Sequence, residues 1–227
     1  MKHIFISATS KLKEETSLYR CFSESLSFKQ YKLVFIENNT IGLSKLYNKC
    51  IQQYKDKYDY IHFVHDDVYI YDDISILCNT IEQGNYDISG VAGAGSIKIS
   101  YPSGWYDMAA KAPTRDIKGK IEHFYVDKNT STYLLFNSNQ LSGECVIVDG
   151  VYMCVKTSNL GEWKFNENYD FHHYDLASCI DAVRCGLCIG VVNIHIKHEL
   201  VPKPISIHDP IWVESDKRFL AEYYVNK

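Results

Sequence analysis

The chain has 227 residues, of which 46% are apolar and 23% charged, and its formal net charge is −4. This composition is typical of a globular protein with a hydrophobic core, and the length suits one large domain or two small ones. The acidic balance argues against a nucleic-acid partner, because phosphate binding needs an excess of Lys and Arg on one face.

Residues 1–95 alternate between strand-like and helix-like patterns. Apolar runs predict strands, and apolar residues at helical spacing predict helices between them. The predicted strands cover 3–8, 32–36, 60–67 and 88–92, and the predicted helices cover 11–28, 43–54 and 74–81. This alternation indicates an α/β fold in which a mostly parallel central sheet has helices on both faces.

Polar side chains follow three of these predicted strands. They occupy 7–10, 37–40 and 65–67. Because the carboxyl ends of parallel strands meet at one edge of a sheet, we expect these side chains to line a single ligand-binding crevice.

The pattern is less regular after residue 95. Alternating runs at 121–126 and 132–136 predict a hairpin, and strand-like runs at 145–148 and 151–155 flank Asp149 and Gly150. Residues 171–175 open a predicted helix, a last strand is expected over 187–196 and ends at His195 and His198, and 211–224 reads as a helix. Because no linker or internal repeat separates the halves, we expect one domain over 1–227, and the helical pattern close to the last residue suits a piece of a longer protein.

Eight cysteines are spread along the chain, and only Cys185 and Cys188 have the spacing of a metal or redox motif. One such pair is weak support for a zinc protein, so we interpret the cysteines as buried, reduced thiols. Reduced thiols, the lack of 18 consecutive apolar residues and a short, strand-like N-terminus together favour a cytoplasmic protein without a transmembrane segment or signal peptide.

Two adjacent carboxylates, Asp66 and Asp67, end the apolar run that starts at Tyr60. Neighbouring acids at a strand end are costly unless a cation lies with them, and carboxylate oxygens suit Mg²⁺ or Mn²⁺. The alternative is a strand followed by a solvated acidic turn.

Three ordered segments resemble the GT-A glycosyltransferases, in particular family 2-like enzymes of the streptomycin-biosynthesis type. The first joins Tyr47 and Asn48 to the strand ending in His65, Asp66 and Asp67. The others are the strand with Asp149 and Gly150, and the helix start over 171–175 followed by a strand ending in His. The resemblance covers nearly the whole chain. It departs from the group's pattern at His65, since the metal motif is not a strict Asp-x-Asp, and at Ala177, where the group often has a second Asp.

The resemblance implies a single GT-A (Rossmann-like) domain with a nucleotide-sugar-binding half over 1–95 and a smaller antiparallel acceptor and catalytic half over 96–227. It implies metal-dependent, inverting transfer of a sugar from a nucleotide-sugar, with UDP favoured, to a hydroxyl of a glycan or glycoconjugate. The donor and the acceptor are then the expected partners, and Mn²⁺ or Mg²⁺ the cofactor.

The same resemblance assigns roles to the acids and histidines. Asp67 is the expected direct metal ligand, and Asp66 binds the metal through water or holds the ribose. His198 or His195 completes the metal site; the alternative for each is a surface or satisfied core histidine.

Inverting transfer needs a carboxylate that takes the proton of the acceptor hydroxyl. Asp175 is the expected base and Asp149 its competitor, while the alternative for Asp175 is a helix cap.

Donor contacts are expected from the ends of the first two strands and from the helix after them, namely from Thr9, Glu37, Asn38 and Asn48 together with Asp66. The alternative for Asn38 is turn chemistry. Two further function hypotheses remain: an inactive nucleotide-sugar-binding domain, motivated by Ala177, and a zinc protein built on Cys185, Cys188 and histidines.

Overall fold

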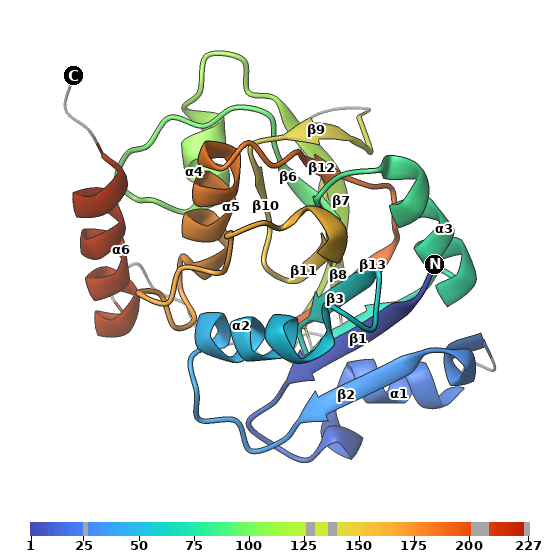
Figure 1. The fold of residues 1–227 in the computed structure, drawn as a ribbon. Helices are drawn as coiled ribbons and strands as arrows, with labels where there is room; N and C mark the ends of the chain where they lie inside the picture. The colour runs from blue at the N-terminus through green and yellow to red at the C-terminus, as the bar shows by residue number, and fades with distance from the viewer. Residues whose placement is uncertain (25–26, 126–129, 136–139, 201–208, 225–227) are drawn as a thin grey trace.

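The structure is a computed structural model that describes residues 1–24, 27–125, 130–135, 140–200 and 209–224 (Figure 1). Its strands form two sheets that share the core. The strands are β1 (His3–Ala8), β2 (Lys32–Ile36), β3 (Tyr60–Val64), β4 (Val68–Ile70), β5 (Ile88–Gly90), β6 (Ala92–Ala94), β7 (Ile117–Tyr125), β8 (Thr130–Leu135), β9 (Gly143–Cys145), β10 (Ile147–Val148), β11 (Tyr152–Lys156), β12 (Ile189–Val191) and β13 (Ile196–Leu200).

Six α-helices and three 3₁₀ turns connect these strands within the described residues. They are η1 (Lys13–Glu15), α1 (Ser17–Glu24), η2 (Ser27–Gln30), α2 (Leu43–Tyr54), α3 (Ile74–Gly84), α4 (Trp105–Ala110), η3 (Thr157–Asn159), α5 (Tyr174–Arg184) and α6 (Pro210–Tyr223). None of the described helices is both long enough and apolar enough to cross a bilayer.

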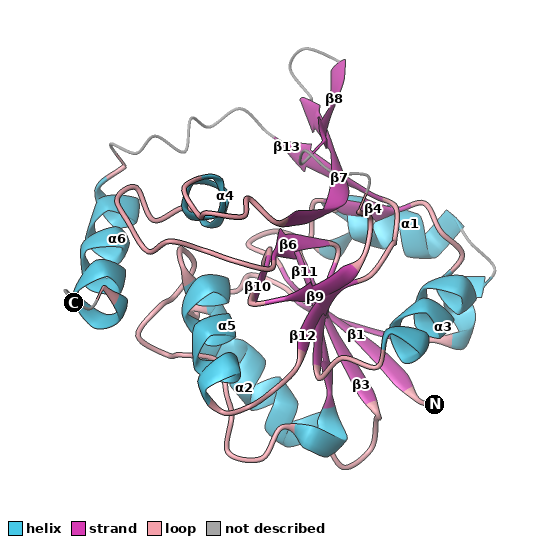
Figure 2. Ribbon diagram, turned by 90° about the horizontal axis from the view of Figure 1, so that it is seen from above, coloured by secondary structure: helices cyan, strands magenta, loops and turns pink. Residues whose placement is uncertain are grey.

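The main sheet has the strand order β2-β1-β3-β11-β5-β12-β9. Strands β1, β2 and β3 are parallel to one another, and β5 is parallel to β12, whereas β11 runs antiparallel between β3 and β5. Helices α2 and α5 lie on one side of the central strands and α1 and α3 on the other (Figure 2). The expected α/β fold with a mostly parallel central sheet is confirmed.

The second sheet has the order β10-β6-β7-β13-β4, with β8 paired to β7. Its pairings are antiparallel except that between β7 and β13. The hairpin expected from 121–126 and 132–136 is therefore present as β7 and β8, although 126–129 and 136–139 lie outside the described residues.

Two expected single strands are each divided between the sheets. The run 88–92 splits at Val91 into β5 and β6, and the run 145–148 splits at Val146 into β9 and β10. Strands β6 and β10 approach each other closely at this point. A Cβ added at Gly93 would lie 2.1 Å from the carbonyl oxygen of Ile147, so glycine is needed for the two strands to pair.

The last expected strand, 187–196, is wrong as a single element. It forms β12, a crossing segment and then β13. Val192 and Ile194 in the crossing are as buried as the strand residues, which is why the apolar pattern runs on without a break. The expected helix over 11–28 is likewise divided, into η1, α1 and η2, whereas α2, α3, α5 and α6 lie where helices were predicted.

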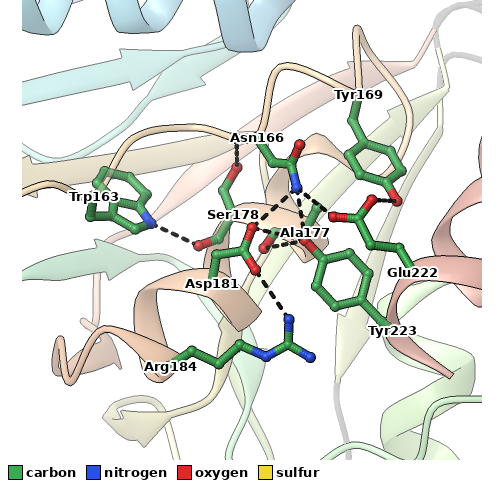
Figure 3. A network of polar contacts seen from close by, with 9 residues as sticks. All are labelled: Trp163, Asn166, Tyr169, Ala177, Ser178, Asp181, Arg184, Glu222 and Tyr223. Carbon is green, nitrogen blue, oxygen red and sulfur yellow. Dashed lines mark hydrogen bonds and ion pairs between the residues drawn. The ribbon is translucent and has the colours of Figure 1, made fainter. Parts of the chain in front are cut away.

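Helix α6 is fastened to α5 by a network of polar contacts (Figure 3). The Tyr223 hydroxyl donates to Asp181 Oδ2 at 2.8 Å, and Asn166 Nδ2 donates to the Tyr223 oxygen at 2.9 Å and to Glu222 Oε1 at 3.0 Å. Tyr169 donates to the other oxygen of Glu222 at 3.0 Å. The network fixes α6 against the helix that begins at the candidate site.

Candidate functional site

The acidic turn between β3 and β4 is held by backbone hydrogen bonds from three directions. The amide of Leu18 donates to Asp66 O at 3.1 Å, that of Glu199 to Asp67 O at 2.8 Å, and that of His65 to Val151 O at 3.1 Å. The two aspartates therefore have fixed positions at the end of β3.

Asp66 and Asp67 point to different partners. The hydroxyl of Thr9, at the end of β1, donates to Asp66 Oδ2 at 2.6 Å. Asp67 Oδ1 lies 3.2 Å from His198 Nε2 on β13. The turn thus connects the end of the parallel sheet with the second sheet.

His65, Asp67 and His198 form a cluster whose ligand atoms all lie within 4.8 Å of one another. Among the described residues, Asp67 Oδ1 is a buried oxygen for which no hydrogen bond of good geometry is found. One carboxylate oxygen and two imidazole nitrogens that converge in this way are a donor set that suits Mn²⁺ and similar divalent ions. The geometry therefore fits the divalent metal that the sequence implied.

The charges in this cluster are coupled. Burial opposes ionisation of Asp67, but the close contact with His198 and its charge outweigh burial and lower the pKa of the carboxyl. Burial also disfavours His198 as a cation, yet Asp67 raises the pKa of His198 above its ordinary value. Burial lowers the pKa of His65. A cation is thus already favoured beside Asp67.

His123 is a neighbour of this cluster that the sequence interpretation did not include. It pairs with His198 in the register of β7 and β13, and the two rings are 5.4 Å apart. Its Nδ1 is among the buried nitrogens of the described chain without a hydrogen-bond partner. No local pattern marks His123, because its relationship to His198 depends on the pairing of strands far apart in the sequence.

A cavity of about 210 Å³ opens next to His65. Asp149 and Asp175 lie in its wall, and Trp105, Phe171 and Trp212 contribute aromatic surface. The indole Nε1 of Trp105 donates to Asp149 Oδ2 at 2.7 Å, which orients that carboxylate. The cavity therefore combines two acids with flat apolar faces beside the metal-type cluster.

Asp175 is held at the first turn of α5. The amides of Gly150 and Leu176 donate to its two oxygens at 2.8 and 2.9 Å. Burial and the nearby charge of Asp149 raise the pKa of Asp175 to about 7. A carboxylate with this pKa is suited to accept a proton near neutral pH.

A second cavity, of about 420 Å³, lies at the ends of β1 and β2. Thr9, Asn39 and Asp66 line it, and Phe171 borders both cavities. The structure thus places Asp66 in one cavity and both catalytic candidates, Asp149 and Asp175, in the adjoining one.

Other residues expected at the donor site lie elsewhere. Glu37 accepts a hydrogen bond from the amide of Lys13 at 2.8 Å. Asn38 is an exposed turn residue with φ of 52°. Buried Asn48 holds Phe165 through bonds of 2.8 and 2.9 Å, so it supports the chain behind the site.

His195 is separate from the metal-type cluster. Its Nε2 lies 3.8 Å from Glu122 Oε2, and its ring packs on Tyr71 at 4.5 Å. The cysteine pair is separate too: Cys185 is exposed, and neither it nor Cys188 belongs to a metal-type group among the described residues. All eight cysteines are free, and six are buried as expected, whereas Cys185 is exposed and Cys188 half-buried.

No family model and no curated protein matches this chain. Solved structures do match it. A197 from STIV has a TM-score of 0.52 at 10% identity, with 88% of this chain and 86% of that chain covered. GalNAc-T7 with UDP, GalNAc and Mn²⁺ has a TM-score of 0.52 at 7% identity, and the match covers 99% of this chain and 49% of that chain. This chain therefore spans about half the length of GalNAc-T7. S. aureus TarS 1-349 in complex with UDP-GlcNAc has a TM-score of 0.49 at 11% identity, with 89% and 60% covered.

Proposed function

We propose that a GT-A fold, which the structural neighbours share, serves here as a metal-dependent, inverting glycosyltransferase. The donor is a nucleotide-sugar, with UDP favoured, and the acceptor is a hydroxyl of a glycan or glycoconjugate. The observation that carries the proposal is that His65, Asp67 and His198 converge beside a cavity whose wall holds Asp149 and Asp175. GalNAc-T7, which is similar in fold, was solved with UDP, GalNAc and Mn²⁺.

The metal would be held by Asp67, His198 and His65, with Asp66 close by. A bound divalent ion supplies positive charge that stabilises the departing diphosphate as the anomeric bond breaks. The donor nucleotide fits the larger cavity, where Thr9 and Asp66 are hydrogen bonded to each other and the amide of Asn39 donates to Thr9 O at 2.8 Å. The sugar then extends past Phe171 into the smaller cavity.

Asp175 is the base in this proposal. With a pKa of about 7 it is partly ionised at neutral pH and accepts the proton of the attacking hydroxyl. Asp149, which Trp105 holds at 2.7 Å, orients hydroxyls of the donor or acceptor. Since the oxygen attacks from the acceptor side as the diphosphate leaves from the other, the anomeric centre is inverted.

The same proposal assigns nucleotide-sugar binding to residues 1–95 and acceptor binding and catalysis to residues 96–227. The first part supplies Thr9, Asp66 and Asp67, and the second supplies Asp149 and Asp175. His198 also comes from the second part. By its ordered motifs, the chain resembles the family 2-like group of the streptomycin-biosynthesis type.

The alternative is an inactive nucleotide-sugar-binding domain. Position 177, where that group often has an acid, is a fully buried alanine in α5. Nucleotide binding without release of nucleoside diphosphate in the presence of acceptors would favour this alternative.

The test is a thermal-shift panel of nucleoside diphosphates and nucleotide-sugars, each with Mn²⁺ and with EDTA. Binding to the folded state raises the melting temperature by mass action. The shift is taken between samples with and without nucleotide at the same metal condition, so that an effect of the metal alone cancels. We expect a shift for one nucleotide that requires Mn²⁺; no shift with any of them would overturn the proposal.

A further inference from the structure

A second cluster of metal-type donors lies in the core, away from the candidate site. His3 on β1, His62 on β3 and Cys78 on α3 are all buried, and their ligand atoms lie within 4.8 Å of one another. His3 Nδ1 and His62 Nε2 are 2.8 Å apart. Three donors from three separate elements therefore point at one spot.

A fourth donor lies beside them. Cys154, on β11, has its Sγ 3.8 Å from His62 Nε2. In a tetrahedral zinc site, nitrogen ligands are about 3.3 Å apart and nitrogen and sulfur about 3.6 Å apart, given the usual bond lengths. To reach this geometry the two histidines must move about half an ångström apart. Cys154, which lies outside the group of three, must also move closer to the other donors.

The outer nitrogens of both imidazoles are already engaged. His3 Nε2 donates to Glu82 Oε1 at 2.8 Å, and His62 Nδ1 pairs with the hydroxyl of Tyr152 at 2.6 Å. A carboxylate or hydroxyl on the far ring nitrogen is the usual support of a metal-bound histidine. The inner nitrogens are thus turned toward the common point.

We propose that His3, His62, Cys78 and Cys154 bind a divalent cation of the zinc class. Four protein donors leave no open position, so the ion is structural rather than catalytic. It would fasten β1, β3 and β11 to α3. The proposal is independent of the glycosyl-transfer proposal, because His3 pairs with Tyr60 at the start of the strands whereas the candidate site lies at their other end.

The competing explanation is a neutral hydrogen-bond chain. Tyr152 would donate to His62, His62 to His3, and His3 to Glu82, and every polar atom of the chain would be satisfied without an ion. The two explanations differ in one measurable respect: only the metal site places thiolate sulfur on a cation.

Cobalt(II) makes that difference visible. Thiolate bound to Co²⁺ gives an intense charge-transfer band, and the cluster of His65, Asp67 and His198 contains no thiol. The experiment measures bound metal in the purified full chain, exchanges it for Co²⁺, and records this band. We expect one equivalent of zinc-class metal that survives Asp67→Asn, and a thiolate band in both proteins.

Variants assign the band to residues. Cys78→Ser should abolish it and Cys154→Ser should weaken it, whereas Cys50→Ser, another buried cysteine outside the cluster, should leave it unchanged. Wild-type protein that is folded yet shows no thiolate band with Co²⁺ would overturn the proposal and leave the hydrogen-bond chain. A band that persists in Cys78→Ser would overturn it as well, and the wild-type measurement stands even if a variant fails to fold.

Discussion

The imidazole of His198 lies 3.2 Å from the carboxylate of Asp67, so a residue on β13 completes the acidic turn that follows β3. The turn alone would be a pair of solvated acids. With His198 and His65 it becomes a cluster that fits a divalent ion beside the cavity of Asp149 and Asp175.

Asp67→Asn should abolish Mn²⁺-dependent donor binding and lower transfer by about 100-fold or more, because a bound metal contributes several kcal/mol of charge stabilisation. Calorimetric titration with the nucleotide-sugar, with and without Mn²⁺, measures the binding. Asp56→Asn, an exposed acid on the turn after α2, is the matched control and should behave as wild type. Unchanged Mn²⁺-dependent affinity in Asp67→Asn would remove Asp67 from the metal site.

Asp175→Asn should retain donor binding and lower kcat by about 10²- to 10⁴-fold, since proton transfer by a positioned base contributes a factor of that size. In wild type, the rate should rise with pH up to about 7 and then level off, as the carboxyl of pKa about 7 ionises. Near-normal turnover of the variant would move the role of base to Asp149.

A further prediction concerns the folding stability of wild type relative to Asp175→Asn. The pKa of Asp175 rises from an ordinary 3.8 in the unfolded chain to about 7 in the folded protein, so between these values the folded state holds the proton more tightly. Folding stability of wild type relative to Asp175→Asn should therefore fall as pH rises from about 4 to about 7, by on the order of a few kcal/mol, and stay level above that.

Urea unfolding of the two proteins at a series of pH values measures this difference, and effects of other titrating groups cancel in the comparison. A difference that is constant across the range would mean that Asp175 has an ordinary pKa in the folded protein.

Tyr223→Phe should destabilise the protein by about 1–3 kcal/mol. The change leaves Asp181 without the hydroxyl that donates to it at 2.8 Å, and it removes one of the three acceptors of the Asn166 amide, which keeps Glu222 and Asp181. Chemical denaturation measures the loss, and Tyr224→Phe, which removes the hydroxyl of a half-exposed ring, is the control and should change stability little. Equal stability of the two variants would show that the network does not hold α6.

The sequence was most informative where local pattern decides structure. The apolar run from Tyr60 and its abrupt end at two acids placed Asp66 and Asp67 correctly at a strand end, because strand length and polarity are local properties. Helix α2 was predicted at its observed bounds for the same reason. The comparisons confirm the α/β, GT-A-type fold.

The sequence alone did not predict which strands, far apart along the chain, pair with each other. The crossing through Val192 and Ile194 is buried like a strand, so apolar content could not separate β12 from β13, and His195 and His198 appeared to share one strand end. Only His198 reaches the cluster. Residue His123 was missed because its neighbour is set by the β7–β13 register. Asn48 looked like a donor contact because its role in holding Phe165 depends on a loop far along the chain.

The antiparallel strand β11 fills the space between β3 and β5. A polypeptide that ended at residue 95 would contain β1, β2, β3 and β5 but would lack β11 and β12. Strands β3 and β5 would then be separated by the width of one strand, and each would have unpaired backbone groups. Such a fragment would recruit foreign strands rather than bind a nucleotide. The acidic turn would also lack two of its three backbone hydrogen bonds, because the acceptor Val151 O and the donor amide of Glu199 both lie beyond residue 95. The two parts of the chain must therefore fold together.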